Sequence, residues 1–425
     1  MRNAVTFSAL AAILGTFSPV AQAGSGAELV QAEGVSIAVR RPQTGPAPHV
    51  AIIYENGRSE FHPMCTELAQ RGFLTLCAIE GDNRQGAWES VARDVKAAVE
   101  YARRQPGITK VVIYGHSGGG AVGSFYQAVA ENGVAFCKNP RKLSICNDDL
   151  ANLPPVDAML FPDAHPGLGV MAVRHVNPSL STDGLKVSVN PELDPYDPKN
   201  GFNPHGPSHY SPQFQAKYAK AQAAAMEELI RQAQSIRAKV ASGAITDPAA
   251  DKVVTLAPKL TNHLDESDPT AVGLMSTSKP RRLLRNDGTI VTQIIHSASV
   301  GHPQEASRIL GPPDLATVPF LSRGAVHARD AIDDIDYCTS NSVTVCNVQS
   351  IHVPSLFIAA GAGTFIADGE RMYERSAAKD KEFIVVEGAE HGGAPCTPCE
   401  KTPGEFANSA KNQYDYIRAW INKRF

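Results

Sequence analysis

Long apolar runs are scarce in this chain of 425 residues, which excludes a protein built from membrane-spanning helices. The one pronounced run covers residues 4–17, follows Arg2, and precedes an Ala-Gln-Ala sequence at residues 21–23. It is shorter than the roughly 20 apolar residues that a spanning helix needs, and this succession is typical of a cleaved secretory signal peptide. We therefore expect residues 1–23 to be removed, leaving a periplasmic or secreted protein without a membrane span.

An excess of charge of either sign is also absent, since 40 Lys and Arg face 43 Asp and Glu. Proteins that bind nucleic acid carry basic patches, so a nucleic-acid partner is not expected. The composition, 43% hydrophobic and 20% charged, is that of an ordinary globular protein, and the length allows more than one domain.

Cysteine spacings typical of zinc sites are lacking as well. The C-x-x-C at residues 396–399 has no second C-x-x-C to complete such a site. In an oxidising compartment close cysteines are instead expected to form disulfides. We predict three local bonds, which are Cys137 with Cys146, Cys338 with Cys346, and Cys396 with Cys399. The remaining Cys65 and Cys77 fit either a fourth bond or two buried thiols.

What the chain does have is a pronounced strand-to-turn pattern at residues 110–122, KVVIYGHSGGGAV. Its β-branched and aromatic residues predict a buried strand, and the glycines that follow fit G-x-S-x-G around Ser117. A serine on so tight a turn needs glycine on either side to let neighbouring segments approach. The pattern indicates that Ser117 is a nucleophile, and that the Gly118 N–H points toward a developing oxyanion.

At this point the chain resembles the α/β-hydrolase family, over residues 49–163 and 351–425. Strand-like segments alternate with helix-like ones across both ranges, which is typical of a mostly parallel sheet. The resemblance implies an α/β fold with a mostly parallel, doubly wound sheet and a large, mainly helical cap insertion. It also implies a second oxyanion N–H after the strand at residues 49–54, where Asn56 stands.

The same resemblance implies that His391 is the catalytic base. This histidine lies in GAEHGG, just past a predicted strand at residues 382–386. A serine hydroxyl is a poor nucleophile until an imidazole accepts its proton. The chain order, Ser117 before His391, agrees with the order in the family.

The acid that would orient His391 is left open by the sequence. Its common place in the family is the loop after the strand at residues 355–359, where the first carboxylates are Asp368 and Glu370. Some members carry the acid after the preceding strand, and Asp163 directly follows such a strand at residues 156–161. We favour Asp163, with Glu370 and Asp368 as alternatives, and we interpret the nearby His165 as a pocket or structural residue.

Three parts are expected after the signal peptide. Residues 24–163 and 351–425 form the core, and residues 164–350 form a cap that contains a long helix at residues 212–241. The cap is interpreted as a lid over the substrate pocket. Within it the segment DPYDPKNG favours a solvated turn over a calcium site, because no bidentate glutamate completes a calcium loop.

The expected function is hydrolysis of a carboxylic ester through an acyl-enzyme. A cap of this size suits a bulky, partly apolar substrate, either a small molecule or an oligomer. No cofactor or metal is implied, and the oligomeric state is left open. The alternatives are cleavage of an amide or a carbon–carbon bond by the same residues, or a non-catalytic binding protein that has kept the fold.

Overall fold

We describe the fold from a computed structural model of the chain. The residues it describes are 26–55, 63–80, 88–183, 186–254, 264–268, 270, 273–300 and 314–425. The predicted signal peptide and Asn56 lie outside them. No helix in these ranges is both long enough and apolar enough to cross a membrane.

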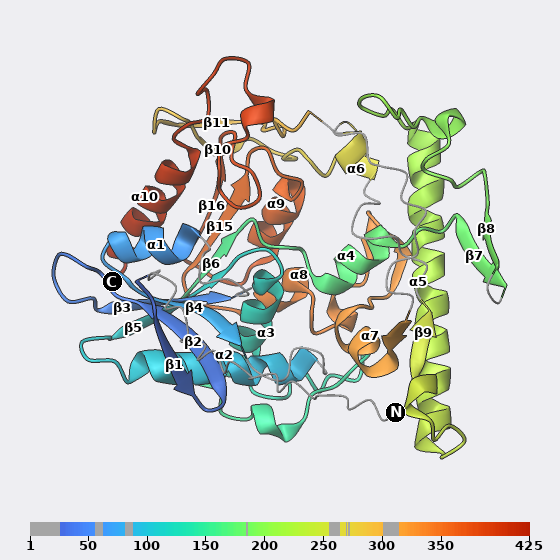
Figure 1. Ribbon diagram of the computed structural model, residues 1–425, viewed down its shortest axis with the longest axis horizontal. Helices are drawn as coiled ribbons and strands as arrows, with labels where there is room; N and C mark the ends of the chain where they lie inside the picture. The colour runs from blue at the N-terminus through green and yellow to red at the C-terminus, as the bar shows by residue number, and fades with distance from the viewer. Residues whose placement is uncertain are drawn as a thin grey trace, which may run out of the picture.

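A ten-stranded sheet forms the centre of the molecule, in the order β1-β2-β4-β3-β5-β6-β15-β16-β10-β11 (Figure 1). Neighbouring strands from β4 through to β10 run parallel, and antiparallel pairs close both edges. The predicted fold class is confirmed by this sheet. Its strands are β1 (Glu28–Ala32), β2 (Val35–Arg40), β3 (Val50–Glu55), β4 (Leu74–Glu80), β5 (Lys110–Gly115), β6 (Ala158–Pro162), β10 (Arg281–Leu284), β11 (Ile290–Gln293), β15 (Ser355–Ala360) and β16 (Lys381–Val386).

Helices cover both faces of the sheet because alternate residues of its strands are apolar on each side. In β3, Val50 and Ile52 pack toward one face, whereas Ala51 and Ile53 pack toward the other. The first face is covered by α1 (Pro63–Gln70) and α10 (Ser409–Asn422). The second is covered by α2 (Trp88–Arg103), α3 (Gly119–Asn132) and α9 (Ile366–Arg375).

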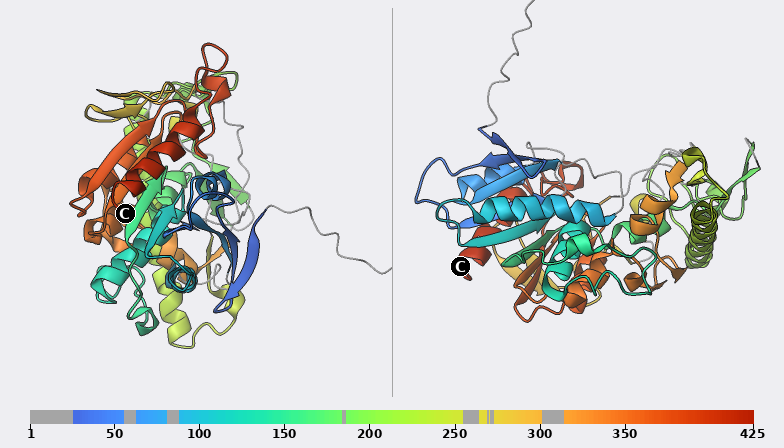
Figure 2. Two further views of the ribbon diagram at one scale, coloured as in Figure 1. Left: turned by 90° about the vertical axis from the view of Figure 1, so that its left-hand side faces the viewer. Right: turned by 90° about the horizontal axis from the view of Figure 1, so that it is seen from below.

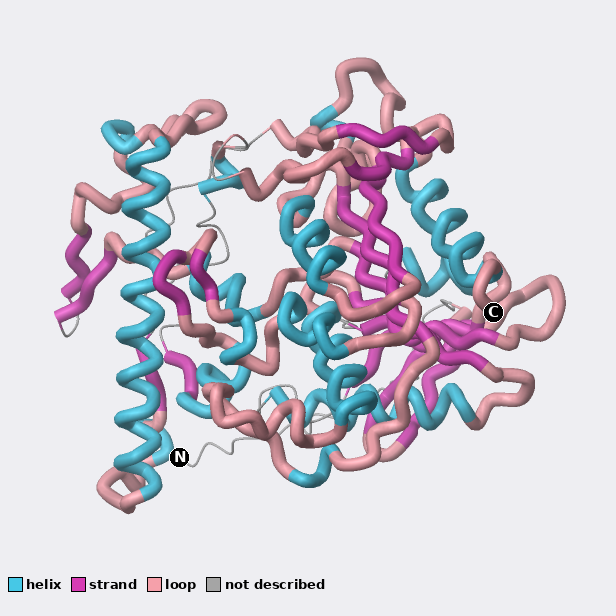
Figure 3. The backbone as a smooth tube through the Cα atoms, turned by 180° about the vertical axis from the view of Figure 1, so that it is seen from behind, coloured by secondary structure: helices cyan, strands magenta, loops and turns pink. Residues whose placement is uncertain are grey.

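The cap lies beside the sheet, with the 30-residue helix α5 (Pro212–Ala241) along the side of the molecule farthest from β1 (Figures 1 and 3). Seen from below, the sheet and the cap stand next to each other (Figure 2). The helix begins where the Ser211 hydroxyl accepts a hydrogen bond from the Phe214 N–H. Other elements are α4 (Leu168–His175), β7 (Leu180–Asp183), β8 (Lys186–Val189), β9 (Lys252–Val254), α6 (Leu264–Ser267), β12 (Asp314–Ala316), α7 (Thr317–Arg323), β13 (Ala328–Asp330), β14 (Asp334–Ile335) and α8 (Thr344–Asn347). Short 3-10 helices lie at Asp148–Leu150, Pro198–Asn200, Pro248–Ala250, Tyr337–Thr339, Val348–Ser350 and Thr397–Cys399.

The first turn of the cap is fixed tightly to a segment far along the chain. A Cβ on Gly167 would lie 2.5 Å from the Cα of Val343, so only glycine fits there. On either side of it, the Leu168 N–H donates to Ser342 O and the Val345 N–H donates to Pro166 O. The beginning and the end of the predicted cap range, at residues 166–168 and 342–345, are therefore packed directly against each other.

One part of the predicted cap range belongs to the sheet. Strand β10 pairs with β16 through residues Arg282 to Leu284, and β11 follows it after a turn at Gly288, whose φ is +85°. Placing residues 281–293 in the cap was therefore wrong. These strands are four residues each, too short for an alternating pattern to stand out. The other boundaries of the cap remain a prediction.

Four disulfides join cysteines in the structure. The three local pairs are bonded as predicted, and Cys65 of α1 is bonded to Cys77 of β4. The fourth bond settles the alternative that the sequence left open. It ties a covering helix to the strand beneath it.

Candidate active site

Ser117 lies on the sharp turn between β5 and α3. Its φ is +56°, in the left-handed region that residues other than glycine rarely adopt. A Cβ on Gly115 would lie 2.9 Å from Gly119 O, and one on Gly120 would lie 2.5 Å from the Cβ of Ala164. The glycines around Ser117 thus let the turn close and let α3 begin against the segment after β6. Ser117 itself is 7% exposed.

His391 and Asp163 continue from Ser117 in one chain of hydrogen bonds. His391 Nε2 lies 2.8 Å from Ser117 Oγ, and His391 Nδ1 lies 2.6 Å from Asp163 Oδ2. The other carboxylate oxygen of Asp163 accepts the N–H of Ala360 at 3.0 Å. Asp163 is 5% exposed and directly follows β6, so the sheet holds it in place. The three residues come from the ends of three separate strands.

Asp163 makes the imidazole of His391 more basic than that of an ordinary histidine. Burial acts to lower the pKa of His391, but the hydrogen bond and the negative charge of Asp163 outweigh it and raise the pKa above its ordinary value. Since Nδ1 donates to Asp163, neutral His391 has a free lone pair at Nε2 for the Ser117 hydroxyl proton. A serine, a base and an orienting carboxylate in this geometry can carry out nucleophilic acyl transfer.

The two alternative acids take part in ion pairs with arginines. Asp368 receives two hydrogen bonds from Arg174, at 2.6 and 3.2 Å, and a third from Arg371. Glu370 accepts from Arg281 at 2.5 Å and from the Ser278 N–H. Of the three carboxylates considered, the one within hydrogen-bond distance of His391 Nδ1 is Asp163.

Gly118, the predicted oxyanion donor, lies at the start of α3 next to Ser117. It is the residue just before α3, so its N–H belongs to the amino-terminal end of a buried helix, which favours negative charge nearby. The other predicted donor, Asn56, falls outside the described residues.

Two further histidines contact these residues: His165, which the sequence indicated only as a pocket or structural residue, and His116, to which it gave no role. His165 Nε2 lies 3.0 Å from Ser117 Oγ, and His116 Nε2 lies 2.7 Å from His391 O. The Phe365 ring packs against both His165 and His391. The signal for both histidines was their position in sequence, because His116 adjoins Ser117 and His165 follows Asp163 on the same tight turns.

No group of three or more His, Cys, Asp or Glu in the described ranges is arranged to hold a metal ion. In the segment DPYDPKNG, the carboxylates of Asp194 and Asp197 accept main-chain N–H groups two residues ahead. Such bonds are those of tight turns. The segment therefore forms turns as predicted, but Asp194 is buried rather than solvated.

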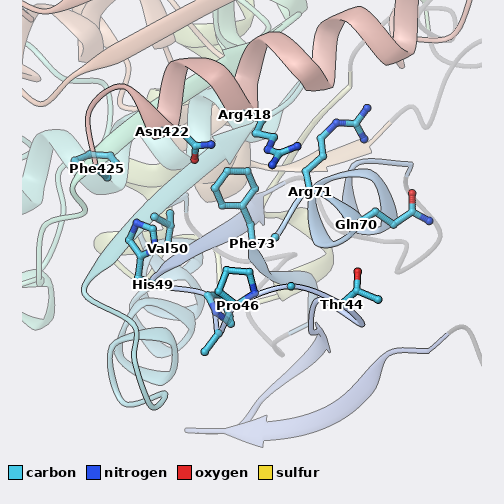
Figure 4. A pocket seen from close by; sticks show the side chains of 14 residues that line it. Thr44, Pro46, His49, Val50, Gln70, Arg71, Phe73, Arg418, Asn422 and Phe425 are labelled. Carbon is cyan, nitrogen blue, oxygen red and sulfur yellow. The ribbon is translucent and has the colours of Figure 1, made fainter.

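A separate cavity of about 460 Å³ lies at the opposite end of β3 from this site (Figure 4). His49 and Val50 line it at the start of that strand, together with Phe73, Arg418 and the terminal Phe425. The cavity shares no lining residue with the chain of hydrogen bonds at Ser117.

The chain is similar to several solved structures at low sequence identity. No protein-family model and no curated protein matches the chain. Among solved structures it is similar to a monoacylglycerol lipase of Paleococcus ferrophilus, with 13% identity, 93% of this chain and 98% of that chain covered, and a TM-score of 0.38. It is also similar to the esterase domain of a Rhodothermus marinus protein, at 11% identity, 93% and 98% coverage, and a TM-score of 0.39. A bromoperoxidase from Bacillus anthracis matches at 10% identity, 93% and 100% coverage, and a TM-score of 0.37.

These matches are too distant to carry an argument about activity. The strand order, the helices on both faces and the strand–turn–helix at Ser117 are features of the chain itself. By these features the protein has the α/β-hydrolase fold.

Proposed function

We propose that this protein is an exported serine hydrolase that cleaves a carboxylic ester through an acyl-enzyme intermediate. The observation that carries the proposal is the chain of hydrogen bonds from Ser117 Oγ through His391 to Asp163. Each group has the chemistry that its place requires: a hydroxyl to attack, an imidazole to accept its proton, and a buried carboxylate to orient the imidazole.

The reaction proceeds in two halves. Ser117 Oγ attacks the ester carbonyl while His391 takes the hydroxyl proton, and His391 then returns this proton to the departing alcohol. The Gly118 N–H stabilises the negative oxygen of the tetrahedral intermediate. In the second half a water gives a proton to His391 and attacks the acyl carbon, and the C–Oγ bond breaks as His391 protonates Oγ.

The cap supports a bulky, partly apolar substrate, a small molecule or an oligomer. The chain passes from Asp163 into the first cap helix, α4, within a few residues, so the cap begins at the rim of the site. The Phe365 ring against His165 and His391 supplies an apolar wall beside the reacting groups. A small hydrophilic ester would gain little from such surroundings.

Export is supported by the disulfides. Structural disulfides persist in oxidising compartments and are rare in the cytosol. All eight cysteines of the chain are paired in the four bonds. Together with the amino-terminal pattern, this favours the periplasm or secretion.

A fluorophosphonate probe tests the nucleophile. The probe is expected to label the protein at Ser117, and Ser117→Ala is expected to abolish both labelling and hydrolysis of p-nitrophenyl esters. A series of acyl chain lengths, compared with the matching anilides, tests the preference for apolar esters over amides. Labelling that persists in Ser117→Ala would refute the assignment. A wild-type protein that is neither labelled nor active would favour a non-catalytic binding protein.

A further inference from the structure

Ser117 Oγ lies between two imidazoles rather than one. His391 Nε2 is 2.8 Å away on one side, and His165 Nε2 is 3.0 Å away on the other. The two rings are nearly parallel, with 13° between their planes and 5.9 Å between their centroids. In the proposed reaction His391 alone transfers protons, so the contact between His165 and Ser117 has a separate role.

The direction of the hydrogen bond from His165 follows from the number of protons available. His391 donates Nδ1–H to Asp163, so its neutral ring accepts at Nε2, and the single hydroxyl proton of Ser117 goes there. No hydroxyl proton remains for the second imidazole. His165 must therefore carry a proton on Nε2 and donate it to a lone pair of Ser117 Oγ.

The position of His165 is set at both its main chain and its side chain. Its N–H donates to Ser117 O at 2.9 Å, and its ring packs on Phe365 with 4.9 Å between the centroids. The turn that begins at Asp163, with a φ of +42°, directs the chain back over Ser117. The turn that begins at Asp163 thus places the Asp163 carboxylate next to His391 and the His165 ring next to Ser117.

We infer, on the basis of the proposed function, that His165 is a second catalytic histidine whose Nε2–H stabilises Ser117 Oγ when that atom is the leaving group. In the acyl-enzyme Oγ is an ester oxygen, which accepts hydrogen bonds poorly because its lone pair is delocalised. As the C–Oγ bond breaks, the oxygen gains negative charge and the same bond becomes charge-assisted and stronger. His391 still delivers the proton that Oγ receives, and His165 keeps its own.

The contribution is therefore larger in deacylation than in acylation. Before acylation Oγ is a hydroxyl oxygen that already accepts well from His165, so part of the bond strength is present in the ground state. Only interactions that strengthen between ground state and transition state accelerate a step. Loss of the donor is expected to slow deacylation by about 10- to 100-fold, and acylation by less.

Three variants test this inference. His165→Asn shortens the side chain so that its amide cannot reach Oγ, whereas His165→Gln carries an amide N–H to about the place of Nε2. His165→Phe keeps the aromatic packing on Phe365 without a donor. The matched control is His352→Phe, because the His352 side chain is 65% exposed and precedes β15, at the amino end of that strand.

Stopped-flow hydrolysis of p-nitrophenyl butyrate gives the acylation burst and the steady rate, and intact-protein mass spectrometry gives the fraction of acyl-enzyme. In His165→Asn and His165→Phe we expect slow deacylation and acyl-enzyme that accumulates, with much of the rate restored in His165→Gln and no change in the control. Equal loss in both half-reactions, or a His165→Gln variant no faster than His165→Asn, would overturn the inference. Absence of both burst and fluorophosphonate labelling in the wild type would instead overturn the proposed function.

Discussion

His116 fixes the main chain of His391, with His116 Nε2 donating to His391 O at 2.7 Å. A carbonyl oxygen can only accept, so Nε2 carries the proton, and Nδ1 is left to accept from the Tyr54 hydroxyl 3.4 Å away. Burial above all, and then the neighbouring His391, lowers the pKa of His116 to about 4. The ring is therefore neutral at physiological pH and acts as a fixed donor rather than as a base.

Replacing this donor should reduce turnover without unfolding the protein. In His116→Phe the aromatic ring is kept but the bond to His391 O is lost, and we expect kcat to fall by about 5- to 13-fold, in line with a net hydrogen-bond contribution of about 1 to 1.5 kcal/mol. Tyr54→Phe is the comparison, since it removes the hydroxyl that lies 3.4 Å from His116 Nδ1 and leaves the bond to His391 O in place. Steady-state kinetics on a p-nitrophenyl ester measure kcat, and circular dichroism checks that the variant is folded. An unchanged kcat in His116→Phe would show that the His391 loop needs no such anchor.

The acid is identified by comparing activity with stability. Asp163→Asn should lower turnover by about 10⁴-fold, because the amide favours the wrong imidazole tautomer and cannot stabilise the imidazolium. Asp368→Asn should instead lower the free energy of unfolding by about 3 to 5 kcal/mol, because the buried Arg174 loses the carboxylate charge that compensates its own. The folded fraction of that variant should keep nearly full kcat. Urea unfolding and active-site titration separate the two effects, and a catalytic loss confined to Asp368→Asn would reverse the assignment.

The pH dependence of activity follows from the raised pKa of His391. The base works when neutral, so kcat/KM should fall as the pH drops through a midpoint above 6.5, the ordinary pKa of histidine. In Asp163→Asn only the effect of burial remains, and the His391 pKa, followed by NMR of the ring, should drop below 6.5. The raised pKa also means that protonated His391 stabilises the fold below pH 6.5, and that this contribution is lost as the pH rises through the folded-state value. A wild-type midpoint below 6.5 would contradict this account.

The disulfides should differ in their effect on stability. Removal of Cys65–Cys77 by a double alanine substitution should lower the free energy of unfolding by about 2 to 4 kcal/mol, because the bond closes a longer loop than the other three do. The same change at Cys396 and Cys399 should have the smallest effect. Thermal unfolding measures both, after non-reducing peptide mapping has verified the pairs in the exported protein. Similar losses at the two sites would mean that loop length does not determine the contribution.

The parts of this protein that could be predicted are those coded locally. The strand before Ser117 and the strand before Asp163 stand out as short apolar runs, and the turn between strand and helix is specified by adjacent glycines. The cysteine pairs nearest in sequence are the ones that could be assigned. In each case the interacting residues are close in sequence, so the geometry of the chain allows few conformations and few partners.

The rest depends on contacts between distant segments. The sequence favoured Asp163 but left Glu370 and Asp368 open, because the choice rests on which carboxylate reaches a histidine more than two hundred residues away from Asp163. It also could not assign His165, whose role depends on a direct contact with Ser117. The strands β10 and β11 were missed because segments so short gain a place in the sheet only by pairing, β10 with β16 and β11 with β10.

The close packing of Gly167 on Val343 holds together two segments that are far apart in sequence. The hydrogen bonds of Leu168 and Val345 tie residues 166–168 to residues 342–345, so the two ends of the predicted cap are joined just after the turn that carries Asp163 and His165. We therefore expect Asp163 and His165 to keep their positions relative to Ser117 when a substrate binds.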